Sequence, residues 1–305
     1  MLTKYSSQSV AWVDLENPTE EEIRKIMEEY SVNPIVAREL ISPSFRSRVD
    51  LYGNLIYLIL HFPRTRDNGK GEDKRDNEID FVIGKKFIIT ARYSPIEALH
   101  KVSRLFEMNS LLEKSDDRHA GHLFFRMMRE IYGSLLHEID SVRGSIREVE
   151  SKIFKGRERE MVVEISKISR IILDFKSAFG LHAEVLESFE VAGKKFFGQD
   201  FDYELHAIIG EYAKIENALR ANSEFAGELR DTNDSLLSSK QNEIMKTITI
   251  IAFIFLPFSI IGSFFQMNTE STPLIGLPYD WLIAVGIMVS AAFTLFVVAK
   301  MKRWL

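Results

Sequence analysis

The sequence predicts a membrane protein with an α/β cytosolic domain, then long helices, then two C-terminal transmembrane helices. Three observations predict this fold class. The 305-residue chain is rich in charge up to about residue 240 and nearly free of charge afterwards. Short β-type runs alternate with helical patterns in the first part of the chain. Between Pro95 and Asn242 there is no proline and little glycine, which favours long helices.

Residues 1–95 are predicted to form the α/β domain. Thr19 begins a helix and has Glu22 three residues later, a capping-box pattern in which each side chain accepts from the other residue's backbone N–H. Asn33-Pro34 begins a second, short helix. Four apolar runs have the character of strands, which gives helices packed on a small mixed sheet: residues 10–15, 55–62, 78–84 and 86–93.

Residues 96–241 are predicted to form a helical cytosolic stalk. Residues 127–154 and 163–190 carry apolar side chains at the three- and four-residue spacing of amphipathic helices. A break at residues 193–201 separates them from a last helix, which starts near Asp202 and meets no proline before Pro257. This helix would therefore run from the stalk into the membrane.

Two apolar runs near the C-terminus predict transmembrane helices. Thr247–Met267 and Trp281–Ala299 contain no ionised residue, and each is close to the roughly 20 residues that cross a bilayer as a helix. A buried hairpin of a soluble protein is the alternative, but the flanking Lys246 and Lys300 favour spanning. The expected segments are the first span with the end of the stalk helix, an external loop, the second span and a basic tail: 242–267, 268–280, 281–299 and 300–305.

The distribution of charge predicts the orientation. Lysine and arginine lie before the first span and after the second, whereas the loop between the spans carries only Glu270 and Asp280 as charged residues. The positive-inside rule therefore places both termini in the cytoplasm and the loop outside the cell membrane. The N-terminus lacks the apolar core of a signal peptide, so none is expected.

Composition and motifs argue against several functions. A net charge of −5 and a pI of about 5.9 do not suit a nucleic-acid binder, and the absence of cysteine excludes a thiolate zinc site. There is no P-loop, Rossmann glycine pattern or G-x-S-x-G elbow, so no enzyme and no cofactor are expected. His119 and His122, at i and i+3, could ligate a metal from one helical face, but no third ligand is in view and they are interpreted as a surface or core pair.

Steps of three and four residues from Asn242 follow one face of the first span. Except for two bulky apolar members, its residues are small or polar, and we call this face the polar strip: Asn242, Met245, Thr249, Ala252, Leu256, Ser259, Ser263 and Gln266. Such a repeat keeps one face toward a common axis when helices supercoil. The opposite face is apolar and suits lipid or the second span: Ile250, Ile254, Phe258, Ile261 and Phe265.

The polar strip has two interpretations. Small and hydroxyl residues allow membrane helices to pack tightly. Alternatively, several copies of the chain surround a pore, in which Thr249, Ser259 and Ser263 line wet segments. Met245 and Leu256 would then form apolar rings that gate by dewetting. One span cannot enclose a pore, so the second interpretation requires a homo-oligomer.

Acidic and amide side chains extend the polar strip at both ends. On the cytosolic side the same face carries Glu224, Glu228 and Asp231, which would form carboxylate rings in a cation funnel or, alternatively, an ordinary solvated face. On the outer side Asn268 offers a neutral oxygen that suits a hydrated ion such as Mg²⁺, and Glu270 adds negative charge at the pore entrance.

Nearly the whole chain resembles the CorA family of divalent-cation channels. The stretch AWVDLENPTEEEI is similar to the family's first strand and helix, residues 242–268 resemble its pore helix, and KMKRWL resembles its basic tail. The resemblance implies an α/β/α cytosolic domain, two spans per subunit and a pentameric pore. It also implies transport of Mg²⁺, with Co²⁺ or Ni²⁺ as further candidates, and gating by cytosolic Mg²⁺.

The resemblance implies roles for individual residues. Met267 and Asn268 match the family's Gly-Met-Asn selectivity motif, whereas Gln266 replaces its glycine. Asn242 falls on an inner polar ring, and the hydrophobic gate falls on Met245, Ile248 and Leu256. Members of the family also sense Mg²⁺ through acidic residues between subunits; the candidates here are Asp202 and Glu204, which are alternatively ordinary helix-start carboxylates.

Gln266 keeps alternative functions open. Glycine adopts positive φ freely and lets the backbone approach an ion or a neighbouring subunit, whereas glutamine adds a bulky amide beside the asparagine. A zinc transporter of the same fold is one alternative. A membrane-anchored relative that does not conduct is the other.

Overall fold

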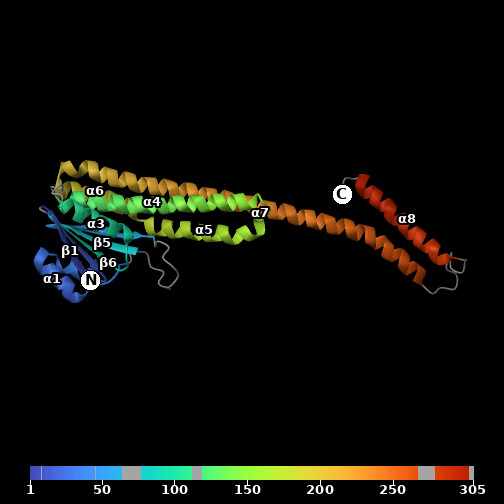
Figure 1. Ribbon diagram of the computed structural model, residues 1–305, viewed down its shortest axis with the longest axis horizontal. Helices are drawn as coiled ribbons and strands as arrows, with labels where there is room; N and C mark the ends of the chain where they lie inside the picture. Colours follow the sequence, from blue (N-terminus) through green and yellow to red (C-terminus); the bar gives the residue numbers. More distant parts are fainter. Residues whose placement is uncertain (8, 45, 64–76, 112–118, 267–278, 302–305) are drawn as a thin grey trace. The chain divides into compact units, whose positions relative to one another are not determined.

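The computed structural model describes residues 1–7, 9–44, 46–63, 77–111, 119–266 and 279–301 (Figure 1). The chain divides into two compact units, Met1–Leu229 and Arg230–Leu305. The helix α7 (Asp202–Gln266) contributes residues to both units.

The first unit contains a six-stranded mixed sheet with the strand order β1-β2-β6-β5-β4-β3. Only the pair β2 and β6 is parallel. Four strands match the predicted runs: β2 (Ala11–Glu16), β4 (Leu55–Phe62), β5 (Asn77–Ile83) and β6 (Phe87–Arg92). The two edge strands, β1 (Leu2–Ser6) and β3 (Arg48–Tyr52), were not predicted, because each is short and only partly buried.

Helices α1 (Glu20–Tyr30) and α2 (Pro34–Glu39) cover one face of the sheet. The predicted capping box is confirmed: Thr19 Oγ1 accepts from the Glu22 backbone N–H at 3.3 Å, and Glu22 Oε2 accepts from that of Thr19 at 3.0 Å. Both helices bury aliphatic side chains against the strand residues that point to this face.

The other face of the sheet packs against α3 (Glu97–Leu111), α4 (Ala120–Ile153), α5 (Glu158–Phe179), α6 (His182–Phe197) and the start of α7. The unit is thus an α/β/α sandwich with its largest core on this side (Figure 1). The helical stretch expected over residues 163–190 is broken at Gly180–Leu181, where α5 ends and α6 begins. A short 3₁₀ turn, η1 (Gln199–Phe201), precedes α7 at the predicted break.

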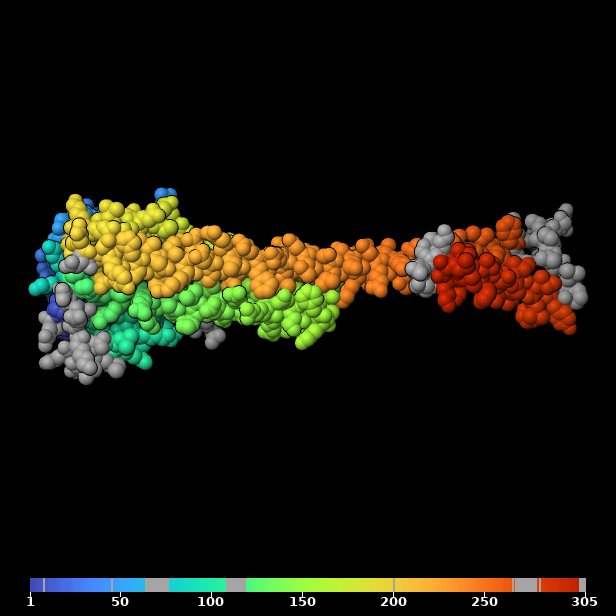
Figure 2. Space-filling view, turned by 90° about the horizontal axis from the view of Figure 1, so that it is seen from above, coloured from blue at the N-terminus to red at the C-terminus, as the bar shows by residue number. Residues whose placement is uncertain are grey.

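The second unit consists of the C-terminal part of α7 and the helix α8 (Asp280–Met301). Both helices are long and apolar enough to cross a membrane. Figure 2 shows both helices, and their contact is marked by Gly262, where an added methyl group would lie 3.3 Å from Met288 Cε of α8. Ile250 and Ala299 are buried in this unit. The helix α7 continues through Pro257, as a membrane helix can.

Candidate functional site

The polar strip is exposed along its whole length in the second unit. The expected apolar face on the other side is partly covered: Ile250 is 8% exposed, and Ile254 and Ile261 are half-buried, because α8 packs there. Positions beside the strip, such as Phe255 and Phe264, are also exposed but apolar, and they suit lipid. The strip is therefore a polar surface of α7 that no described residue of this chain covers.

The hydroxyl groups of the polar strip all donate to their own helix. Thr249 Oγ1 donates to the Met245 carbonyl at 2.8 Å. Ser259 Oγ donates to Phe255 O at 3.3 Å, and Ser263 Oγ donates to Ser259 O at 2.9 Å. These bonds satisfy the hydroxyl protons in an apolar medium and leave the oxygen lone pairs as acceptors.

Apolar positions interrupt the polar strip at two levels. Met245 is 55% exposed and Leu256 is 61% exposed, although both side chains are large and apolar. Ile248, the third gate candidate, is also exposed and lies beside the strip. Bulky apolar side chains that no described residue covers are what an assembly of several copies would bring together.

The expected selectivity filter is described only at its first residue. Gln266 is the last residue of α7, and its side chain is exposed. Met267, Asn268 and the entrance carboxylate Glu270 lie outside the described residues. Their roles stay predictions.

The three carboxylates of the predicted cytosolic funnel are all exposed on α7. Glu224 and Glu228 belong to the first unit, and Asp231 belongs to the second. Within the described residues none of them forms an ion pair, so all three are available to attract cations.

The two candidate regulatory carboxylates point to different partners. Asp202 lies 2.7 Å from Lys194 Nζ, an ion pair with α6. Glu204, two residues further along the helix, has its Oε1 2.6 Å from His122 Nδ1 of α4. Residues i and i+2 of a helix face different directions, which explains the separation. Asp202 and Glu204 therefore do not form one metal site within the chain.

The pair His119 and His122 is a packing pair, as the sequence indicates. The two rings stack with centroids 4.1 Å apart, and His119 also stacks on Phe197. His119 Nδ1 accepts from the Gly121 backbone N–H and caps α4.

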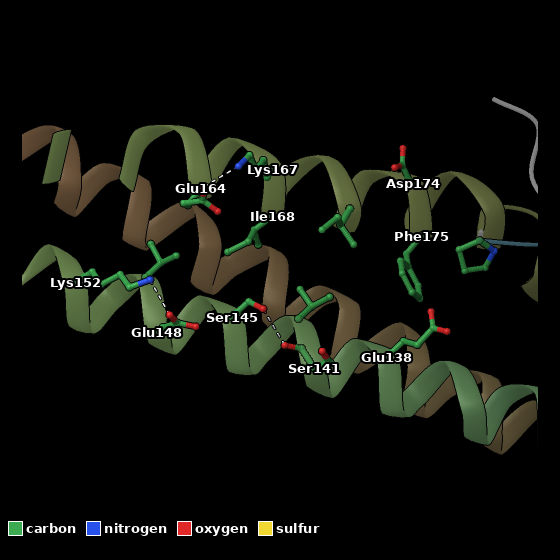
Figure 3. A pocket seen from close by; sticks show the side chains of 14 residues that line it. Glu138, Ser141, Ser145, Glu148, Lys152, Glu164, Lys167, Ile168, Asp174 and Phe175 are labelled. Carbon is green, nitrogen blue, oxygen red and sulfur yellow. Dashed lines mark hydrogen bonds and ion pairs between the residues drawn. The ribbon is translucent and has the colours of Figure 1, made fainter. Parts of the chain in front are cut away.

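The structure also contains two features that the sequence analysis did not identify. One is a cavity of about 550 Å³ between α4 and α5, with an apolar floor that includes Ile168 and Phe175 and a rim of charged side chains (Figure 3). The other is the group Glu190, Asp202 and His206 at the junction of α6 and α7. The sequence does carry a signal for this group. Two i, i+4 pairs flank the predicted break, Glu190 with Lys194 before it and Asp202 with His206 after it.

Comparison with known proteins agrees with this architecture. Residues 7–303 match the family model of the CorA-like Mg²⁺ transporter protein. The cobalt/magnesium transport protein CorA of Thermotoga maritima is 19% identical over 93% of this chain and 80% of its own length.

Two solved structures share the fold. One is the complete structure of the CorA magnesium transporter from Methanocaldococcus jannaschii, with a TM-score of 0.83 at 17% identity. The match covers 99% of this chain and 94% of that chain. The cytoplasmic domain of ZntB from Vibrio parahaemolyticus has a TM-score of 0.60 at 13% identity, over 76% of this chain and 89% of its own. The match to the family model spans both units and both candidate spans. The chain therefore belongs to the CorA-like Mg²⁺ transporter family and is a transporter of divalent cations rather than an enzyme.

Proposed function

We propose that copies of this chain surround an axis and conduct hydrated Mg²⁺ across the cell membrane along the polar strip of α7. The observation that carries this proposal is the strip itself, which is polar, exposed and opposite the face that α8 covers. Five copies are implied by the resemblance. Both termini would lie in the cytoplasm, in accordance with the distribution of lysine and arginine.

Hydrated Mg²⁺ suits the chemistry of this path. The strip offers hydroxyl and amide oxygens and no ionised group, and Mg²⁺ gives up its water reluctantly. The chain has no cysteine, and no histidine follows His206, so the path has no thiolate or imidazole that would bind Zn²⁺ tightly. Co²⁺ and Ni²⁺ could pass as hydrated ions of similar form. The carboxylates Glu224, Glu228 and Asp231 would concentrate cations at the inner end.

The gate is assigned to Met245, Ile248 and Leu256. Apolar rings exclude water from a narrow pore and so block a hydrated ion. Cytosolic Mg²⁺ bound between subunits would hold the closed arrangement, and its loss would let like-charged faces separate. The continuous helix α7 carries residues of both units and links them mechanically.

A zinc transporter of the same fold is the second candidate. It is favoured by the likeness of the first unit to the ZntB cytoplasmic domain and by the replacement of glycine with Gln266. A membrane-anchored relative that does not conduct would also account for Gln266.

Ion uptake into proteoliposomes separates these functions. We expect Mg²⁺ uptake by the wild-type protein and a loss of about tenfold or more for Asn268→Ala, because the asparagine ring would no longer hold the hydrated ion. Thr294→Ala is the control for replacing a polar side chain by alanine outside the proposed pore, since its hydroxyl donates to Ser290 O within α8. Zn²⁺ uptake driven by a pH gradient, without Mg²⁺ uptake, would select the zinc transporter. No uptake of any divalent ion would select the non-conducting relative.

A further inference from the structure

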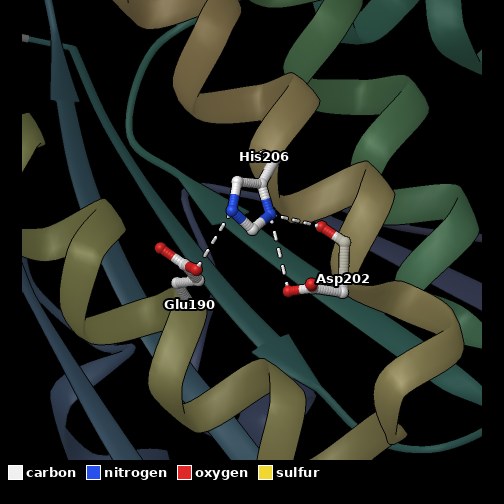
Figure 4. Close-up of side chains that lie close together, drawn as sticks. All are labelled: Glu190, Asp202 and His206. Carbon is white, nitrogen blue, oxygen red and sulfur yellow. Dashed lines mark hydrogen bonds and ion pairs between the residues drawn. The ribbon is translucent and has the colours of Figure 1, made fainter.

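Three potential metal ligands converge where α6 meets α7. Glu190 lies on α6, and Asp202 and His206 lie one turn apart at the start of α7 (Figure 4). One ligand atom from each residue lies within 4.8 Å of the other two. All three residues belong to one chain, so this group differs from an acidic site between subunits.

A hydrogen bond fixes the tautomer of the His206 imidazole. His206 Nδ1 lies 2.9 Å from the backbone carbonyl oxygen of Asp202, which can only accept. Nδ1 must therefore carry the proton, and in the neutral ring Nε2 has a free lone pair. This is the arrangement of a metal-binding histidine whose second nitrogen donates to a backbone carbonyl.

The free nitrogen lies beside a carboxylate at a spacing that suits one metal ion. His206 Nε2 is 3.6 Å from Glu190 Oε1. Two ligands of a tetrahedral zinc ion, each at about 2.0–2.1 Å, lie about 3.3–3.4 Å apart. A small side-chain movement therefore brings both atoms onto one ion. Asp202 Oδ1 lies 3.4 Å from Nδ1, on the protonated side of the ring, so its carboxylate has to turn toward Nε2 to supply the third ligand.

The ammonium group of Lys194 already binds to both carboxylates. Its Nζ lies 2.6 Å from Glu190 Oε1 and 2.7 Å from Asp202 Oδ1. The ammonium group of Lys194 therefore occupies the position between the two carboxylates. Its side chain is flexible and 41% exposed, so it can move away into solvent.

We propose that Glu190, Asp202 and His206 bind a divalent transition-metal ion of the Zn²⁺, Co²⁺ and Ni²⁺ class, and that Lys194 is a tethered competitor for the same position. Imidazole with two carboxylates suits these ions, whereas Mg²⁺ prefers an all-oxygen site that keeps its waters. Binding would release Lys194 and join α6 to α7 at the first turn of the long helix. This proposal does not depend on conduction through the polar strip.

Calorimetric titration of the full-length protein in detergent, with Co²⁺ as the probe and excess Mg²⁺ in the buffer, tests the site. Mg²⁺ occupies the oxygen-only sites, so the remaining Co²⁺ isotherm reports on imidazole-containing sites. We expect His206→Gln to weaken this isotherm about tenfold or more, the scale of a disrupted metal site. His137→Gln, at an exposed histidine of α4, is the matched control.

Lys194→Gln should change the Co²⁺ affinity in the opposite direction to His206→Gln. An increase in affinity cannot result from misfolding. Removing the competitor should tighten Co²⁺ binding severalfold, whereas Lys195→Gln, at the exposed neighbour, should leave it unchanged. Equal Co²⁺ isotherms for the wild type and His206→Gln would overturn the proposal. Weaker binding by Lys194→Gln, or the absence of any Co²⁺ isotherm in the excess Mg²⁺ of the buffer, would also overturn it. Because no ion flux is measured, a failure here is distinct from a failure of the proposed transport.

Discussion

Gln266 is the residue that most directly affects the proposed transport. Gln266 is the last residue of α7, and it keeps the helical conformation there. A glycine at this position would favour ending the helix. Its amide would stand in each subunit next to the asparagine of the filter. We therefore interpret it as a brake on conduction or as a change in ion preference.

Replacement of this residue gives the first prediction. Gln266→Gly should raise Mg²⁺ uptake into proteoliposomes severalfold, because it removes a bulky amide from the mouth of the pore. Gln266→Ala separates the loss of bulk from the gain of backbone freedom, since alanine keeps the helical preference. Uptake by Gln266→Gly equal to that of the wild type would mean that this side chain does not limit transport.

His182 shows how burial affects a titratable residue. It lies in the core between α6 and the sheet, where Nε2–H donates to the His61 carbonyl at 2.7 Å and Nδ1 accepts from the Tyr132 hydroxyl at 3.1 Å. Burial lowers the pKa of His182 to about 3. The ring is therefore neutral in the folded protein at all physiological pH values.

This residue gives a pH prediction. Below about pH 6.5 the unfolded chain protonates this histidine and the folded chain does not, so folding stability falls as pH drops, by about 1.4 kcal/mol per pH unit at most. His182→Gln keeps a donor and an acceptor but cannot be protonated. Melting temperatures of the full-length protein between pH 7.5 and 5 should therefore fall more steeply for the wild type. Parallel curves would mean that His182 does not contribute.

At the scale of elements, the features that depend on neighbouring residues were predicted better than the others. The capping box at Thr19 and the start of α7 at Asp202 depend on neighbouring residues, and both appear as expected. The edge strands β1 and β3 were missed because each is short and only partly buried, so its own pattern is weak, although each pairs with the next strand along the chain. The break between α5 and α6 has no proline to mark it.

Leu256 carries the prediction at this scale. If its side chain closes a dewetted ring, Leu256→Ser should admit water and raise Mg²⁺ uptake severalfold when the internal Mg²⁺ concentration is high. The serine can donate to the carbonyl four residues earlier, as Ser259 and Ser263 do. Ile260→Ser makes a comparable change at an exposed position outside the polar strip and should have no such effect. Equal effects of both changes would argue against a gate at Leu256.

At the scale of the whole molecule, the absence of cysteine permits a direct test of assembly. A single cysteine at Ser263→Cys, on the polar strip, should form cross-linked dimers on oxidation if strips from several copies meet. Phe293→Cys, at an exposed apolar position of α8, should not. Native mass spectrometry should give five times the chain mass of 35.2 kDa. A monomer in detergent and in membranes would contradict the pore.

The sequence predicted the fold class and the two apolar spans well, because charge and hydropathy separate the units clearly. It also predicted which face of α7 is polar. It could not show that Asp202 and Glu204 have different partners, because those partners, Lys194 and His122, come from other helices. For the same reason the sequence does not show that Glu190, Asp202 and His206 lie together, since they come from two different helices.

The hydroxyl bonds of α7 have a consequence for the water in a conduit built from this face. Because Thr249, Ser259 and Ser263 give their protons to the backbone, they can only accept from water. Water molecules along the wall would point their hydrogens outward and their oxygens toward the axis. A passing cation would face the negative ends of these water dipoles, which attract it, whereas an anion would be repelled by them. The wall would therefore reject anions although it carries no formal charge between Lys246 and Gln266.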